Sequence, residues 1–229
     1  SNYRKPLVSI NMKFFETLPI QNILQNQSLQ ALFLQKGSPE GLSTLLRGLS
    51  INPNFVRLQL RSMKRLDGAL LPELALLQNL KHLDLGYNKI GPSLAQPLAQ
   101  LLHHSFSLLY LDIGGNDIGQ TGMADIFRAI ATNKTLKSFR LIGEASGGLI
   151  EMLANDNMTL TDVFLGPGHE QDAIEYWCTV NRCGRGRLRD EQFRKEDLMR
   201  LLEQQDGKIM RSSGVIYGLL RTNPALWSH

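Results

Sequence analysis

Residues 80–91 read LKHLDLGYNKIG, and residues 108–119 read LLYLDIGGNDIG. The two stretches share the pattern L-x-x-L-x-L-x-x-N-x-I-G, with Ile in place of one Leu in the second. Looser copies of the first six positions start at Leu7, Leu29, Phe55, Leu136 and Leu160. Seven copies at near-constant spacing indicate one continuous repeat array.

The pattern predicts one short strand in each copy. Its fourth and sixth positions lie two residues apart, so both side chains leave a strand on the same face. A single copy cannot bury that face, but stacked copies form a continuous ladder of aliphatic side chains. We expect the Asn at the ninth position, Asn88 or Asn116, to satisfy backbone groups where the chain turns away from the strand.

Helical patterns separate the predicted strands, because apolar residues recur there at helical spacing. The stripes are Leu42, Leu45, Leu46 and Leu49; Leu94, Leu98, Leu101 and Leu102; Met123, Ile126, Phe127, Ile130 and Ala131; and Leu149, Ile150, Leu153 and Ala154. Pro97 is expected near a helix start, because deeper in a helix it would remove a backbone hydrogen bond.

A strand and a helix in about 28 residues resembles the ribonuclease-inhibitor class of leucine-rich repeat. The resemblance covers residues 7–168. It implies an α/β fold, a leucine-rich-repeat solenoid with a curved parallel sheet on the concave side and helices on the convex side. We therefore expect a solenoid of about seven repeats over residues 1–168.

After residue 168 the repeat stops, and residues 169–229 predict a helical C-terminal capping module that covers the end of the array. Tyr176-Trp177, Asn181-Arg182-x-Gly184-Arg185 and residues 217–226 (YGLLRTNPAL) resemble the end of leucine-rich-repeat proteins of diatoms and related algae, which carry an LNRxGR segment. The chain departs from that pattern at Val180, where Leu is usual. This resemblance implies an algal type of repeat protein more than an activity.

Four arginines gather in this module: Arg182, Arg185, Arg187 and Arg189. In one interpretation they pair with acids and cap helix carbonyls. In the other they contact an anion or an acidic partner. No aromatic residues alternate with them, and we expect no binding of nucleic acid.

The third, fifth and seventh positions of each strand are expected to face the concave side, where repeat solenoids bind their partners. Interfaces favour Arg, Tyr and Phe as anchors. The predicted partner-binding residues are Phe33, Arg57, Arg61, His82, Asp84, Tyr110, Asp112, Arg140 and Phe164.

Charge is distributed unevenly along the chain. Residues 1–66 carry a formal charge of +7, residues 67–168 carry −4, and residues 169–229 carry +1. No apolar run is long enough to span a bilayer, so we expect no transmembrane segment. The two cysteines, Cys178 and Cys183, give no disulfide framework, and a reducing intracellular compartment is expected, either an organelle or the cytoplasm.

No residue set predicts catalysis, a cofactor or a metal. Asp84 and Asp112 take equivalent places in adjacent repeats, and paired carboxylates can carry out acid–base chemistry. An open sheet face excludes no water, however, and His82 has no nucleophile near it in the pattern. We expect no catalytic residues, no bound cofactor and no metal site.

The sequence therefore predicts a non-catalytic scaffold that binds protein partners through its concave strand face, as a peripheral subunit of a larger assembly. An alternative is a regulator of a small GTPase similar to the repeat protein that activates Ran, although its functional loop cannot be aligned here. A ligand sensor that works with a separate nucleotide-binding domain is a third interpretation. The last two rest on fold analogy alone.

Overall fold

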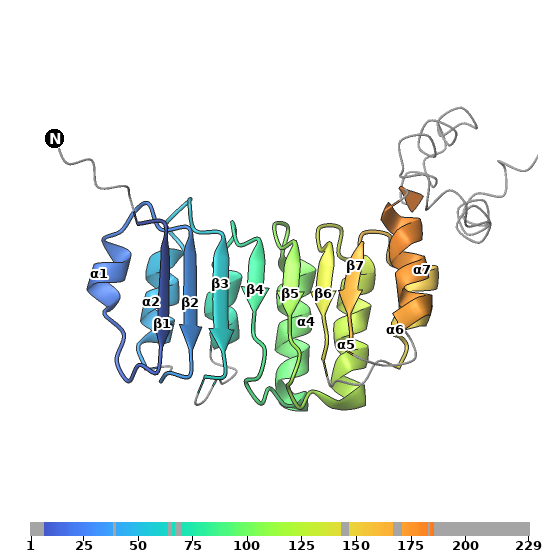
Figure 1. The fold of residues 1–229 in the computed structure, drawn as a ribbon, viewed down its shortest axis with the longest axis horizontal. Helices are drawn as coiled ribbons and strands as arrows, with labels where there is room; N and C mark the ends of the chain where they lie inside the picture. Colours follow the sequence, from blue (N-terminus) through green and yellow to red (C-terminus); the bar gives the residue numbers. More distant parts are fainter. Residues whose placement is uncertain are drawn as a thin grey trace, which may run out of the picture.

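The computed structural model describes residues 7–38, 40–63, 66, 70–142, 147–166, 171–182 and 184–185. Seven parallel strands form one sheet in the order of the sequence (Figure 1). They are β1 (Ser9–Lys13), β2 (Ala31–Gln35), β3 (Arg57–Arg61), β4 (His82–Asp84), β5 (Tyr110–Asp112), β6 (Ser138–Arg140) and β7 (Asp162–Phe164). The predicted α/β solenoid with a parallel sheet is confirmed.

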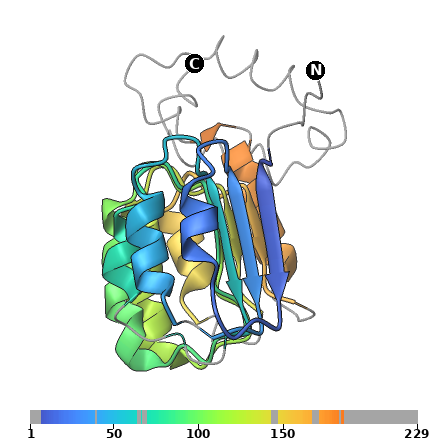
Figure 2. The same cartoon turned by 90° about the vertical axis from the view of Figure 1, so that its left-hand side faces the viewer.

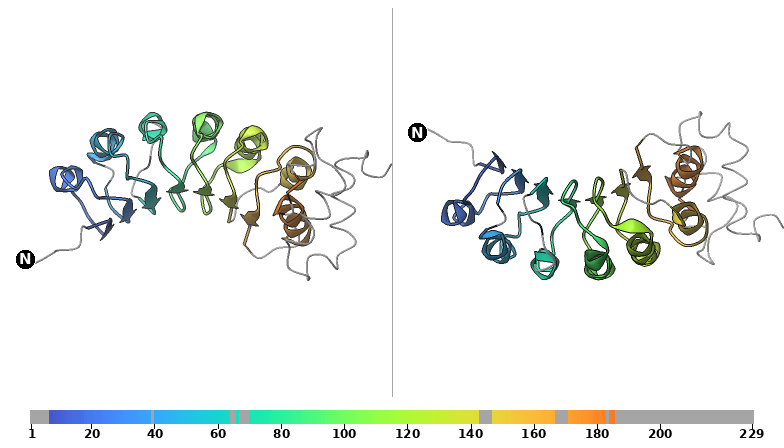
Figure 3. Two further views of the ribbon diagram at one scale, coloured as in Figure 1. Left: turned by 90° about the horizontal axis from the view of Figure 1, so that it is seen from above. Right: turned by 90° about the horizontal axis from the view of Figure 1, so that it is seen from below.

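Helices connect successive strands and cover one face of the sheet (Figure 2). They are α1 (Ile20–Leu24), α2 (Leu42–Leu49), α3 (Leu71–Ala75), the 3₁₀ turn η2 (Pro92–Leu94), α4 (Ala95–His104), α5 (Gly119–Thr132) and α6 (Leu149–Asn155). A last helix, α7 (Gln171–Arg182), follows the seventh strand. Viewed along the strands, α1 to α6 follow the outer side of an arc, and the strands follow its inner side (Figure 3). The open strand face is therefore concave.

The ladder of buried aliphatic side chains lies where the repeat pattern places it. The fourth positions of neighbouring strands are register partners throughout: Ile10, Leu32, Leu58, Leu83, Leu111, Phe139 and Val163. All are buried except Ile10, which belongs to the first strand and is only partly covered. One hydrophobic cluster joins this ladder to the inward stripes of the helices. Pro97 is the third residue of α4, near the helix start as expected.

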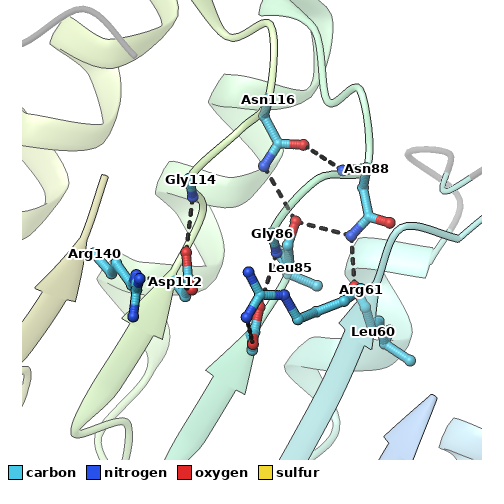
Figure 4. Close-up of polar contacts among 10 residues, drawn as sticks. Leu60, Arg61, Leu85, Gly86, Asn88, Asp112, Gly114, Asn116 and Arg140 are labelled. Atoms are coloured by element: carbon cyan, nitrogen blue, oxygen red, sulfur yellow. Dashed lines mark hydrogen bonds and ion pairs between the residues drawn. The ribbon is translucent and has the colours of Figure 1, made fainter. Parts of the chain in front are cut away.

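Asn88 and Asn116 connect successive turns, as the ninth repeat position predicts (Figure 4). The Asn116 side chain accepts N–H groups of Asn88 and Ile90 at 2.9 and 3.0 Å and donates to the carbonyls of Leu85 and Ile113 at 3.1 and 2.6 Å. Both asparagines are buried. Each buried amide thus has its polar atoms satisfied, and each turn is fixed to its neighbour.

A second row of asparagines, at the ends of the helices, was not predicted. Asn133 donates to the Leu102 carbonyl of the preceding coil and accepts N–H groups of Thr135 and Leu136. Asn157 repeats these contacts, with the Ile130 carbonyl as acceptor and the N–H groups of Thr159 and Leu160 as donors. Asn52 donates to the Leu29 carbonyl of the preceding coil and accepts the N–H of Asn54. The sequence contains a pattern that could have predicted them, because each asparagine lies three residues before the apolar residue that begins the next repeat.

The end of the array is covered by α7, which lies beside α6 and β7 (Figure 1). Ile174 and Cys178 of α7 belong to the same hydrophobic cluster as the ladder. The first part of the predicted capping module therefore packs as one more helix of the array. The rest of that module, with Arg187, Arg189 and the YGLLRTNPAL stretch, lies outside the described residues.

Two of the four C-terminal arginines are within the described residues. Arg182 on α7 pairs with Glu175 of the same helix. Arg185 is buried, donates to the carbonyls of Leu153 and Ala154 at the end of α6, and lies with its guanidinium carbon 4.7 Å from the centroid of the Trp177 ring. These are the contacts of a helix cap. Among the described residues, no helix is both long enough and apolar enough to cross a membrane.

Candidate functional site: the concave strand face

Side chains from six of the seven strands, β2 to β7, meet on the concave face as the sequence predicts. The register places Arg57 beside His82 and His82 beside Tyr110, while Asp84, Asp112, Arg140 and Phe164 form the neighbouring row. Residues far apart in the sequence thus form one continuous surface along the inside of the arc. Whether a partner contacts them stays a prediction.

Arg61 at the end of β3 reaches across to β4. One of its terminal nitrogens lies 3.4 Å from a carboxylate oxygen of Asp84 (Figure 4). Its guanidinium carbon lies 5.0 Å from the centroid of the Tyr87 ring. The side chain is held between a carboxylate and an aromatic face, and it keeps 25% of its surface exposed. A guanidinium fixed in this way loses little conformational entropy on binding.

Arg140 on β6 repeats this arrangement in the opposite direction along the sheet. Its Nε lies 3.7 Å from a carboxylate oxygen of Asp112, and its guanidinium carbon lies 4.8 Å from the centroid of the Phe164 ring. Phe164 is 44% exposed although it is apolar. The two arginines lean toward each other over β4 and β5, each beside a carboxylate (Figure 4). An aromatic ring supports each of them as well.

The sequence places Asp84 and Asp112 on the open face, but both are buried in the structure. Each carboxylate accepts the backbone N–H two residues later, from Gly86 or Gly114, at 2.9 Å. Burial raises the pKa of Asp84, against the opposing effects of the Gly86 N–H and the Arg61 charge. Their visible role is structural, because they hold the strand ends and orient the two arginines.

His82, Tyr110 and Arg57 form the neighbouring part of the surface. The His82 and Tyr110 rings lie 5.8 Å apart between centroids and are tilted by 33°. Burial, and then the positive charges of Arg57 and Lys81, lower the pKa of His82, so the ring is neutral at physiological pH. Arg57 itself is exposed. This half of the face offers a cation beside two stacked polar rings.

Phe33 lies apart from these clusters, toward the β1 end of the sheet. Its register partners are Asn11 and Gln59, and its ring is half-buried between them. It offers an apolar contact within a polar surrounding. Among the described residues, no group of three or more His, Cys, Asp and Glu side chains could hold a metal ion.

Comparison with known proteins agrees with this geometry. A family model described as leucine-rich repeat matches residues 77–99 and 104–127. No curated protein matches the chain in sequence. The structure of leiomodin-1 actin-binding site 2 is similar with a TM-score of 0.53 and 15% identity, over 62% of this chain and 88% of that chain.

The C-terminal domain of tropomodulin from Caenorhabditis elegans is similar with a TM-score of 0.54 and 18% identity, over 66% of this chain and 96% of that chain. At such identities the likeness concerns the fold alone. The parallel seven-strand sheet, the buried ladder and the repeat match together make this chain a leucine-rich-repeat solenoid.

Proposed function

We propose that this chain is a non-catalytic protein-binding scaffold that contacts its partner through the concave strand face. The observation that carries the proposal is the paired support of Arg61 and Arg140, each fixed by a carboxylate and stacked on a ring. Interface energy is concentrated in a few such anchors, with arginine and aromatic residues enriched among them. Because these side chains are already ordered, binding costs less entropy.

The finer features of the proposal rest on the sequence pattern. One strand and one helix in each coil support the ribonuclease-inhibitor-like class, and the Asn181-Arg182-x-Gly184-Arg185 stretch supports an algal type of repeat protein. We also propose that the chain is a peripheral subunit of a larger assembly in a reducing compartment. The buried free thiol of Cys178 is compatible with that environment.

The test is affinity purification of the tagged chain followed by mass spectrometry. The concave variant carries Arg57→Ala and Phe164→Ala. A matched control carries Arg128→Ala and Phe106→Ala, an exposed arginine and an exposed phenylalanine away from the concave face. We expect a specific partner to be recovered with the wild type and the control. Its affinity for the concave variant should be about thirtyfold lower, since two contact side chains of about 1 kcal/mol each are lost.

Equal recovery with both variants would contradict a concave binding site. Recovery of no specific protein with the wild type would count against the scaffold itself. Stimulated GTP hydrolysis by a recovered small GTPase would instead favour the regulator alternative.

A further inference from the structure

The residue at the eighth position of each of the first five repeats, just beyond the strand, lies in a left-handed backbone conformation. Phe14, Lys36, Ser62, Tyr87 and Gly115 have φ angles of 55°, 55°, 50°, 60° and 71°. We call these five residues the exit row, because they lie along the edge toward which the strand arrows point in Figure 1. Each belongs to a different coil.

Hydrogen bonds between coils hold the exit row in place. Phe14 donates its N–H to the Gln35 carbonyl at 3.0 Å, and Lys36 donates to the Arg61 carbonyl at 3.1 Å. Ser62 and Tyr87 donate in the same way to the carbonyls of Gly86 and Gly114, at 3.2 and 2.9 Å. Neighbouring members of the row are therefore about 5 Å apart, the spacing of paired strands.

The left-handed conformation costs about 1–2 kcal/mol for a residue with a side chain and almost nothing for glycine. The fifth coil has Gly115 at this place, so the turn itself needs no side chain. The first and fourth coils nevertheless have Phe14, which is 72% exposed, and Tyr87, which is 47% exposed. Because both rings are largely exposed, burial in the core does not offset the backbone strain at these two positions.

A positively charged side chain lies over each of the two rings. The Lys36 ammonium lies 5.0 Å from the Phe14 ring centroid, and Arg61 stacks on Tyr87. The edge of the first four coils thus has two exposed rings, each beside a cation. Among the described residues, the exposed cations here are Lys13, Lys36 and Lys89. The exposed acids are Glu16 and Glu40, in the loops that follow β1 and β2, and Asp117 follows in the fifth coil.

We propose that the two exposed rings of the exit row, Phe14 and Tyr87, and the lysines around them bind an acidic, extended segment of a protein partner. The carboxylates of the segment pair with Lys13, Lys36 and Lys89, and its apolar side chains lie on Phe14 and Tyr87. The two rings are three coils apart, roughly 15 Å, which an extended peptide covers with about five residues. This site lies on the edge of the array, beside the concave face, and the two surfaces share Lys13 and Arg61, which take the seventh repeat position of their coils.

The test uses a fluorescein-labelled 12-residue peptide of alternating Glu and Leu and measures fluorescence anisotropy. The test variant carries Phe14→Gly and Tyr87→Gly, because glycine suits this backbone conformation and the array keeps its fold. The matched control is Ser62→Gly, which makes the same backbone change in the same row without removing a ring. Thermal unfolding of each variant verifies the fold.

We expect the peptide to bind the wild type and Ser62→Gly with equal affinity. The double glycine variant should bind it at least about fivefold more weakly, because the apolar contacts of two rings are lost. A peptide with Gln in place of Glu should bind more weakly than the acidic one. The concave variant Arg57→Ala with Phe164→Ala should bind the acidic peptide as the wild type does, which separates this site from the proposed scaffold function.

Absence of binding at about 1 mM peptide overturns the proposal, because a dissociation constant of about 1 mM already corresponds to a binding free energy of only about −4 kcal/mol. Equal binding by the double glycine variant also overturns it. A 15-nucleotide oligo-dT that binds the exit row more tightly than the acidic peptide would assign the edge to nucleic acid instead.

Discussion

Asn116 shows how much a single repeat position contributes. Its buried amide makes four hydrogen bonds that join two successive turns. Asn116→Ala leaves two backbone N–H groups and two carbonyls without this partner, and we expect the free energy of unfolding to fall by about 3 kcal/mol. Urea denaturation measures the change. The exposed Asn79→Ala should alter it by less than about 0.5 kcal/mol; a similar loss in both would contradict this account.

Gly115 tests the left-handed position of the exit row. A Cβ atom added there would lie 2.5 Å from the Tyr87 ring, and the φ of 71° is unfavourable for alanine. Gly115→Ala is therefore expected to lower the free energy of unfolding by about 2 kcal/mol. Urea denaturation measures this change as well. Gly91 has an extended backbone and nothing within 4 Å of such an atom, so Gly91→Ala should be nearly neutral in the same assay.

At the scale of elements, one carboxylate joins two helices. Glu73 of α3 accepts hydrogen bonds from Ser43 and Arg47 of α2, both at 2.8 Å. The Ser43 hydroxyl, and then the Arg47 guanidinium, lower the pKa of Glu73 below its ordinary value of 4.5. A lowered pKa in the folded state stabilises the fold above the unfolded pKa, and this contribution is lost as the pH falls through the folded value.

Ser43→Ala should therefore be less stable than the wild type at neutral pH, and the difference should shrink as Glu73 becomes protonated. Urea denaturation of both proteins from about pH 7 to about pH 3 measures this trend. A difference that stays constant over the whole range would show that Ser43 acts through packing and leaves the carboxylate unaffected.

The packing of α7 against the array gives a second prediction at this scale. Cys178 is buried against the core, and that burial, with the Glu175 charge, raises its pKa to about 12. In a Cys183→Ser variant, Cys178 is the one remaining cysteine. Its thiol should therefore resist alkylation by iodoacetamide in native buffer and react in guanidinium chloride. Rapid native labelling would show that α7 leaves the end of the ladder readily.

At the scale of the whole molecule, stability in a solenoid comes from contacts between adjacent coils. Leu83 and Leu111 are register partners in adjacent coils, so deletion of residues 83–110 joins His82 to Leu111 and restores the repeat. We expect a shorter array that unfolds cooperatively at a lower temperature. Deletion of residues 97–110 removes most of α4 without restoring the repeat and should abolish the transition; circular dichroism distinguishes the two.

Much of the fold could be read from the sequence. The repeat pattern predicted the centre of every strand, the row of register partners from Ile10 to Val163 and the buried helix stripes, since each of these follows from a local period. The concave placement of Arg57, His82, Tyr110 and Arg140 followed from the same period. The asparagines at the helix ends were missed because their contacts become visible only between coils.

The amino-acid sequence by itself determined the repeat, because the stacking unit is local and returns at near-constant spacing along the chain. Only the tertiary structure decided which side chains of the concave face remain open. Asp84 and Asp112 are covered because Arg61 and Arg140 reach over them from neighbouring coils, and the exit row is set by hydrogen bonds between coils. Such contacts depend on how coils twist and stack, which no single repeat encodes.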